Sequence, residues 1–266
     1  MEDLHTALKL LPDQTTFKTR PHKTAAYGLL ARVYLSMSDY ENAGKYADSA
    51  LQRYNLLLNY NDLSKPTPNF NPFLQFHDEV IFHHTANSYT IATTSSSSGF
   101  IDTALYDSYN ENDLRKQLFF QQFGNRYKFT GRYAGGSSGL SGIGTDELYL
   151  MRAECLARQN RLDDAMADLN TLMITRWKTG TFVPFSAGTQ DEALEIILME
   201  RRKQLLGRNL RWTDLRRLNL DPRFAVTLTR NVMGQEYTLP PNDPRYTMYI
   251  PSAEVLVNQL VEQNQR

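Results

Sequence analysis

Two pairs of amphipathic segments, each pair joined by a short turn, constrain the fold of this chain more than any other feature. Within residues 21–54, apolar side chains recur at intervals of three and four, and the pattern breaks near Asp39. Residues 145–177 repeat this arrangement, with a break near Asn160. Two helices joined by so short a turn must lie antiparallel. The sequence therefore predicts two helical hairpins.

Residues at the ends of these segments are suited to their positions. Pro21 can begin a helix, where its missing N–H costs nothing. Asp39 can cap the second helix of the first pair, and Thr145 or Asp146 can cap the first helix of the second pair. We therefore expect four helices with defined starts.

Both pairs place small residues where two helices would approach each other, at the spacing of tetratricopeptide (TPR) repeats. The matching positions are Tyr27, Leu30, Ala31, Tyr34, Ala43, Ala47 and Ala50 in the first pair, and Tyr149, Ala153, Leu156, Ala165, Leu169 and Leu172 in the second. Because about 90 residues separate the pairs, a simple tandem TPR solenoid is not expected.

The residues between the pairs, 60–144, are rich in Pro, Ser, Gly, Asn and aromatic residues, which is typical of loops. Residues 80–82 form a short strand candidate, and 102–108 and 112–122 are candidates for short helices. Aromatic loops on a helical scaffold are common places for binding surfaces.

The last third of the chain, 190–266, is expected to be helical with intervening turns. A strong helical pattern covers 190–206 and is followed by Gly207, a residue suited to end a helix. A shorter helix is expected over 208–218, and a terminal helix after Pro251. At the other end, a short amphipathic helix is stopped by Pro12, so the chain begins within a helical pattern.

Composition excludes several classes of protein. Lys and Arg together number 29, as do Asp and Glu, so the net charge of zero argues against a general nucleic-acid binder. The single cysteine, Cys155, cannot form an intrachain disulfide and is expected to be a small buried residue. No apolar run is long enough to span a membrane, and the first residues are no signal peptide.

Candidate catalytic and metal sites are weak. His83 and His84 would point to opposite faces of a strand, and His77 is six residues away, so we predict no metal site and no cofactor. Nothing fixes a catalytic pair among the loop carboxylates, and we predict no catalytic residues. These carboxylates are Asp102, Asp107, Glu111 and Asp113.

A cluster of basic residues begins near the end of the strong helix of the last third and continues beyond it. Its members are Arg201, Arg202, Lys203, Arg208, Arg211, Arg216 and Arg217. We expect these side chains to tie helices together through carboxylates such as Glu200 and Asp214, rather than to bind phosphate. Trp212 is expected to anchor a core.

Five segments, in order, resemble the SusD/RagB family of outer-membrane nutrient-binding lipoproteins. They are RPHKTAAYGLLARVYLSMSDYENAGKYADSAL, DEVIF, LYLMRAECLARQNRLDDAMADLNTL, ILMERRKQLLGRNLRWTDLRRL and YTMYIPSAEVLVNQLVEQNQ. Gly207-Arg208 stands where Glu-Gly is usual in the family, and Gln265-Arg266 replaces a final aromatic residue. The resemblance covers nearly the whole chain.

The resemblance implies a mainly α fold, with TPR-like hairpins, a large irregular loop region and minor β structure, as a single SusD-like domain over 1–266. It implies a non-enzymatic protein that captures an oligo- or polysaccharide, or another nutrient, at the outer membrane and delivers it to a TonB-dependent SusC-like transporter. Members are roughly twice as long and carry an upstream lipid anchor, so we expect this chain to be the C-terminal portion or a variant lacking the N-terminal half.

No family motif assigns the ligand site, so it is predicted from the loop region alone. Aromatic rings stack on the apolar faces of sugars, while polar side chains bond the hydroxyl groups. The predicted rings are Tyr89, Tyr106, Tyr109, Tyr127 and Tyr133, with Asn87, Asp107 and Arg132 as polar partners. The alternative is that most of these rings pack the loops onto the helices.

Two other functions stay open from the sequence. A TPR-type adaptor would bind a peptide in the groove between hairpins, although two separated hairpins are few for such a groove. A glycosidase would require Asp107 or Glu111 as a catalytic carboxylate.

Overall fold

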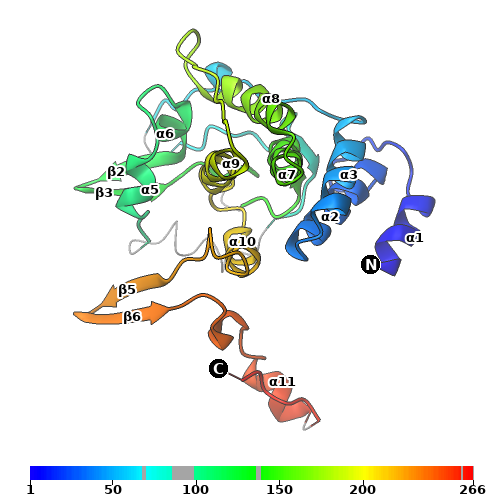
Figure 1. Ribbon diagram of the computed structural model, residues 1–266, viewed down its shortest axis with the longest axis vertical. Helices are drawn as coiled ribbons and strands as arrows, with labels where there is room; N and C mark the ends of the chain where they lie inside the picture. The colour runs from blue at the N-terminus through cyan, green and yellow to red at the C-terminus, as the bar shows by residue number, and fades with distance from the viewer. Residues whose placement is uncertain (68–69, 86–98, 136–138, 259, 266) are drawn as a thin grey trace. The chain divides into compact units, whose positions relative to one another are not determined.

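The structure, a computed structural model, describes residues 1–67, 70–85, 99–135, 139–258 and 260–265. It divides into two compact units, Met1–Leu210 and Arg211–Arg266. The helix-rich architecture with minor strands that the sequence analysis expects is confirmed (Figure 1). A single domain over 1–266 stays a prediction.

The first unit begins with three helices, α1 (Glu2–Leu10), α2 (Lys23–Ser36) and α3 (Tyr40–Leu51). Helices α2 and α3 form the first predicted hairpin. The side chain of Asp39 accepts a hydrogen bond from the backbone N–H of Asn42, so the predicted cap is confirmed.

The second predicted hairpin consists of α7 (Thr145–Arg158) and α8 (Leu162–Met173), which continues into a short 3-10 turn, η2 (Ile174–Arg176). The predicted cap is wrong, because Gly144 is the N-cap residue and no side chain caps the helix. The hydroxyl of Thr145 donates to the carbonyl of Leu56 instead, and Asp146 binds Arg208.

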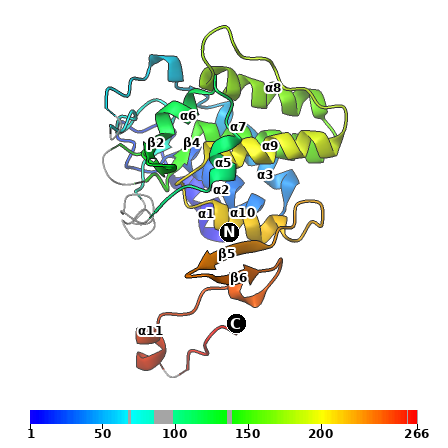
Figure 2. The same ribbon diagram turned by 90° about the vertical axis from the view of Figure 1, so that its left-hand side faces the viewer.

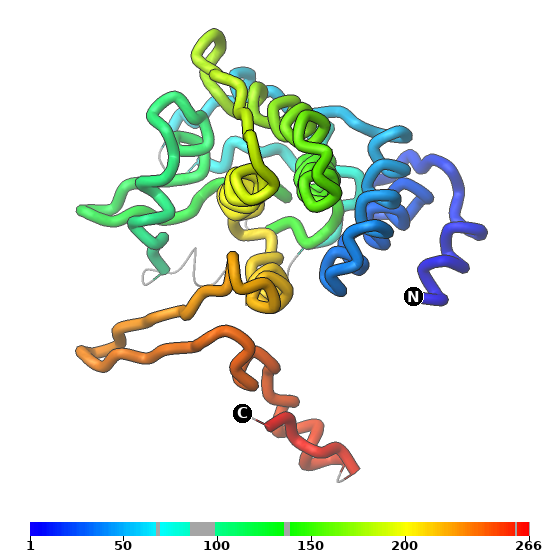
Figure 3. The backbone as a smooth tube through the Cα atoms, viewed as in Figure 1, coloured from blue at the N-terminus to red at the C-terminus, as the bar shows by residue number. Residues whose placement is uncertain are grey.

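The two hairpins pack side by side although a long segment separates them in the chain. Helix α3 lies against α7, and Figure 3 shows the chain leaving the first hairpin and returning to complete the second. A Cβ atom on Gly44 would lie 2.9 Å from the Cβ of Cys155, so the helices approach closely there. Cys155 is buried, as predicted. The small residues therefore allow the close packing that their spacing indicates.

Helix α9 (Gln190–Gln204) lies beside α7 (Figures 1 and 2). Thr189 and Glu192 form a capping box at its start. The helix ends two residues earlier than predicted. Gly207 follows with a φ of +73°, and a Cβ there would lie 2.5 Å from the ring of Phe129.

The segment between the hairpins contains more regular structure than its composition predicts. It forms η1 (Tyr60–Asp62), β1 (Val80–Phe82), α5 (Thr103–Asp107), α6 (Leu114–Phe119), β2 (Phe120–Phe123), β3 (Arg126–Phe129) and β4 (Ile143–Gly144). Strand β1 is the predicted one and pairs antiparallel with β4. The prediction of a helix over 112–122 is wrong at its C-terminal end, because α6 ends at Phe119 and β2 follows and pairs with β3.

Aromatic rings dominate the core of this segment. Its buried members are Tyr60, Phe73, Val80, Leu105, Tyr109, Leu118, Phe119, Phe120, Phe129, Tyr133, Ala134 and Leu140. Most ring pairs meet edge-on or tilted, with centroids 5 to 6.5 Å apart, as for Tyr60 and Phe73 at 5.4 Å. The loop region is therefore a packed second core attached to the helical hairpins.

The second unit contains α10 (Arg211–Leu218), β5 (Leu228–Val232), β6 (Gln235–Leu239), η3 (Pro244–Tyr246) and α11 (Ser252–Val257). The antiparallel hairpin of β5 and β6 is absent from the sequence prediction. Helix α11 begins after Pro251, as expected. Trp212 packs against Tyr246 and donates its indole N–H to that residue's carbonyl.

Within the residues described, no helix is both long and apolar enough to cross a membrane.

Candidate functional site

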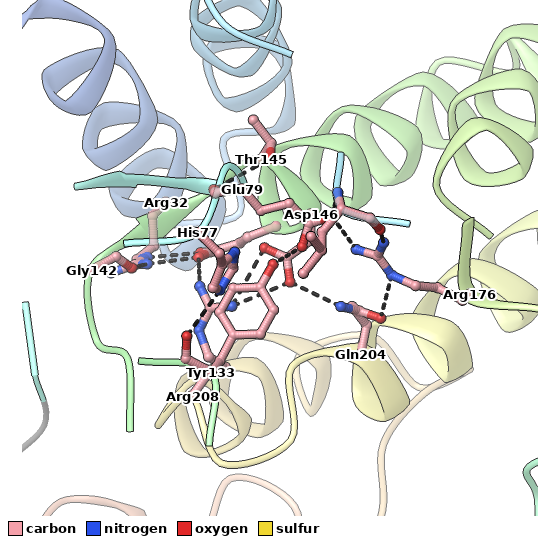
Figure 4. Close-up of polar contacts among 12 residues, drawn as sticks. Arg32, His77, Glu79, Tyr133, Gly142, Thr145, Asp146, Arg176, Gln204 and Arg208 are labelled. Carbon is pink, nitrogen blue, oxygen red and sulfur yellow. Dashed lines mark hydrogen bonds and ion pairs between the residues drawn. The ribbon is translucent and has the colours of Figure 1, made fainter. Parts of the chain in front are cut away.

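A buried network of charges connects the loop region to the helices (Figure 4). Glu79, which precedes β1, is fully buried and accepts from the guanidinium of Arg176 at 2.5 Å. It also accepts from the backbone N–H of Leu58 and from the hydroxyl of Tyr133. Burial raises the pKa of Glu79, and Arg176 opposes that rise. One carboxylate thus joins three segments that lie far apart in the chain.

Asp146 is the second centre of this network. Its carboxylate accepts from Gln204 at 3.0 Å and from Arg208 at 3.2 Å (Figure 4). Burial acts to raise the pKa of Asp146, but Arg208 and Arg176 outweigh burial and lower it. Asp146 is therefore held ionised at the start of α7 and ties α7 to the end of α9.

The basic cluster that begins in the last turn of α9 is largely structural, as predicted. Glu200 is buried, binds Lys203 at 2.9 Å and also binds Arg115. In the second unit, Arg217 binds Asp214 at 2.9 Å. Both predicted carboxylate partners are confirmed, and these side chains serve the scaffold.

The three histidines of the strand region make hydrogen bonds within the protein. The Nε2 atom of His77 lies 3.0 Å from the carbonyl oxygen of Tyr133, and that of His83 lies 3.3 Å from the carbonyl oxygen of Ala134. The Nδ1 atom of His84 lies 2.7 Å from the hydroxyl of Ser141. Each ring bonds a different group of the fold, and the three do not converge on one point.

Two of the five predicted tyrosines are buried. Tyr109 is 2% exposed and donates its hydroxyl to the carbonyl of Lys203 at 2.9 Å. Tyr133 is 4% exposed and donates to Glu79. Both rings pack within the aromatic core, so neither faces solvent.

Two other predicted tyrosines come together. The rings of Tyr106 and Tyr127 stack with centroids 3.4 Å apart and planes 11° apart, and both are half-buried. Burial and the neighbouring Tyr127 raise the pKa of Tyr106 to about 12. Each ring therefore covers one face of the other, which leaves less ring surface for a ligand.

The predicted polar partners are dispersed. Asp107 is exposed at the end of α5, and Arg132 is half-buried, with its carbonyl accepting from Asn71 at 2.7 Å. Tyr89 and Asn87 lie outside the described residues. Whether any of the eight predicted residues binds a ligand stays a prediction.

The hairpin of β2 and β3 offers a different surface. Its strands are joined by Gly124 and Asn125, and side chains alternate between its two faces. Phe120 and Phe129 point into the aromatic core. The opposite face carries Gln121, Phe123, Arg126 and Lys128, none of which is buried.

Phe100 completes this surface. The backbone N–H of Ile101 donates to the carbonyl of Tyr127 at 2.8 Å, which holds the preceding residue beside β3. The ring of Phe100 lies 6.0 Å from that of Phe123, which is 56% exposed. We call the five residues Phe100, Gln121, Phe123, Arg126 and Lys128 the hairpin face.

Cations lie over the rings of the hairpin face. The Nζ atom of Lys128 is 4.3 Å from the ring centroid of Phe123, and the guanidinium of Arg126 is 5.0 Å from that of Phe100. Partly exposed rings can stack on the apolar face of a sugar, while an amide and two cations beside them can bond its oxygen atoms. The hairpin face is therefore the candidate binding surface.

The hairpin face is absent from the predicted site because the helix predicted over 112–122 overlaps most of β2. A signal was present, since Gly124-Asn125 stands between two aromatic-flanked tetrapeptides, FQQF and RYKF. A Gly-Asn pair between two such runs is typical of a β-hairpin.

A cavity of about 510 Å³ lies between α3, α7 and α8, where an adaptor would bind a peptide. Part of its charged lining is paired internally, because Arg152 binds both Asp48 at 2.6 Å and Asp168 at 2.7 Å. A peptide in this cavity would have to compete with these ion pairs.

Comparison with known proteins identifies the family. The family described as "SusD family" matches residues 31–266, and the family described as "Starch-binding associating with outer membrane" matches residues 1–35. No curated protein matches the chain.

Solved structures share the fold. A SusD-like carbohydrate-binding protein from Bacteroides vulgatus is 22% identical with a TM-score of 0.68, and the match covers 97% of this chain and 63% of that one. A SusD superfamily protein from Bacteroides thetaiotaomicron is also 22% identical, with a TM-score of 0.74 and coverage of 100% and 65%. The chain thus spans less than two thirds of the length of these two proteins. Since the match to the SusD family extends over most of its length, the chain belongs to that family.

Proposed function

We propose that this protein binds a glycan, without changing it chemically, and that the hairpin face makes the stacking contacts. The observation that supports this most is the pair of partly exposed rings, Phe100 and Phe123, beside polar side chains on the hairpin of β2 and β3. Family membership supports the same class of ligand, because one matched family is described as starch-binding.

We propose that the protein acts at the outer membrane, following the description of the family that matches residues 1–35. There it would deliver the glycan to a TonB-dependent SusC-like transporter, which is the partner implied by the family resemblance.

A non-catalytic role fits the contacts that the loop carboxylates make within the protein. Asp113 is buried against Arg115, Asp102 caps α5, and Glu111 pairs with Lys116. These three acids serve as structural partners, whereas a glycosidase needs two carboxyl groups that face one substrate.

Affinity gel electrophoresis against a panel of polysaccharides, with starch first, tests the proposal. We expect at least one polysaccharide to retard the protein, and Phe123→Ala to weaken that binding about tenfold. This is the effect of losing roughly 1.5 kcal/mol of ring burial. Incubation should release no reducing ends.

Phe17→Ala is the matched control. Phe17 is also an exposed phenylalanine, at 58%, with the guanidinium of Arg20 5.3 Å from its ring, but it lies outside the hairpin face. Its replacement should leave the retardation unchanged. Absence of binding to every polysaccharide, or equal binding by Phe123→Ala and the parent chain, would contradict the proposal.

A further inference from the structure

We infer that the hairpin face selects glycans that carry negative charge, as carboxylates or sulfate esters, over neutral ones. This inference rests on the proposed function and narrows it to a class of ligand. It is carried by two cations, Arg126 and Lys128, which lie on the face without a carboxylate partner among the described residues.

Three other cations in this part of the fold have carboxylate partners. Lys116 binds Glu111, Arg115 binds Asp113, and Arg202 lies 3.5 Å from Asp102. In the part of the chain that the structure describes, Arg126 and Lys128 instead contact only the rings of Phe100 and Phe123.

A cation over an aromatic ring keeps its N–H groups available. Lysine has three donors and arginine has five, and a ring face accepts few of them. A carboxylate or sulfate can therefore bind these groups by charge-assisted hydrogen bonds without first displacing a protein carboxylate.

The placement of the cations also suits a sugar acid. Lys128 lies over both rings, at 5.5 Å from the centroid of Phe100 and 4.3 Å from that of Phe123. Arg126 stands directly opposite Phe123 across the strand pair. A sugar ring stacked on either phenylalanine would thus place an acidic substituent beside a cation.

Nucleic acid also combines charge with stacking rings, but the chain does not favour it. The net charge is zero, and the hairpin face carries only two cations, whereas nucleic-acid surfaces use an extended basic patch. An anionic glycan is therefore the occupant that we propose.

The test compares polysaccharides that share a backbone and differ in charge. Polygalacturonate is compared with its carboxyl-reduced form, and dextran sulfate with dextran, by affinity gel electrophoresis at 50 and 200 mM NaCl. We expect the parent chain to bind at least one charged polymer about tenfold more tightly than its neutral counterpart at 50 mM. This difference in affinity between the charged and the neutral polymer should decrease at 200 mM NaCl.

The double variant Arg126→Gln with Lys128→Gln should lose this preference and retain any binding to the neutral polymers. Lys178→Gln with Arg161→Gln is the control. It removes the same charge from exposed positions outside the hairpin face and should keep the preference.

The outcomes separate the two proposals. Binding to neutral polymers with no charge preference would overturn the inference alone, as would a preference that survives in the Arg126 and Lys128 double variant. No binding to any polysaccharide would overturn both proposals. A single-stranded oligonucleotide that bound as tightly as the charged glycan would also overturn the inference, because it would indicate simple attraction of polyanions. The charged polymer that binds shows whether a carboxylate or a sulfate is recognised.

Discussion

At the residue scale, the protein relies on charges that are buried and paired. Glu79 and Arg176 lie 97 positions apart in the chain, are both fully buried and form an ion pair. The hydroxyl of Tyr133 donates to the same carboxylate. Burying a charge without a partner costs several kcal/mol. These pairs therefore fix how the loop region attaches to the hairpins.

Some of these contacts could be predicted from the sequence and others could not. Glu200 and Asp214 lie within four residues of Lys203 and Arg217, so helical spacing indicates those pairs. The pairing of Glu79 with Arg176 depends on tertiary structure, which local spacing does not contain. For the same reason, Tyr109 and Tyr133 could not be distinguished from surface tyrosines.

Protonation of His77 should make the protein less stable in mild acid. Burial lowers the pKa of His77 from 6.5 to about 4. Its Nε2–H donates to a carbonyl, and its buried Nδ1 has no partner among the described residues. The pKa of His77 is lower in the folded state than in the unfolded state. The contribution of neutral His77 to the free energy of unfolding is therefore fully present above pH 6.5 and is lost as the pH falls toward 4. We expect a loss of about 2 kcal/mol between pH 7 and pH 5.

Urea denaturation at the two pH values measures this loss. His77→Gln should reduce the difference between them, because glutamine does not titrate. His5→Gln is the control, since His5 is only half-buried, and it should keep the full difference. An equal loss of stability in His77→Gln and the parent chain would show that other groups cause it.

At the scale of elements, helical periodicity predicts the hairpins well, because buried residues recur at intervals of three and four along α2, α3, α7 and α8. The short strands are harder to predict. The sequence of α6 favours a helix, yet Phe120 and Phe129 must both enter the aromatic core from facing strands. Tertiary burial therefore ends the helix at Phe119, which local preference does not indicate.

The pairing of β1 with β4 depends on a glycine. A Cβ on Gly142 would lie 1.8 Å from the carbonyl oxygen of Phe82, so Gly142→Ala must displace one strand. We expect a loss of at least about 2 kcal/mol in the free energy of unfolding, by urea denaturation.

Gly188→Ala is the control for that substitution. The nearest atom to its added Cβ is 3.5 Å away, which is ordinary contact, so stability should change by less than about 0.5 kcal/mol. Gly142→Ala with the stability of the parent chain would contradict the assigned strand pairing.

At the scale of the whole molecule, the first unit combines two kinds of core. The stacked hairpins form a scaffold of small and aliphatic residues, and the segment between them forms an aromatic core that presents the hairpin face. The sequence predicts the scaffold and the aromatic character of the inserted segment. It does not predict which rings are buried. Side chains alternate between the two faces of β2 and β3, and one face becomes buried only when the paired strands pack on the core.

The residues that a bound polysaccharide protects from exchange would show directly whether the hairpin face binds it. Hydrogen–deuterium exchange would be measured with and without a polysaccharide that binds the protein. We predict slower exchange in residues 99–129, strongest in β2 and β3, with α3, α7 and α8 unchanged. Protection confined to α3, α7 and α8, around the cavity lined by Arg152, would show that the hairpin face is not the binding surface and would favour a peptide-binding groove.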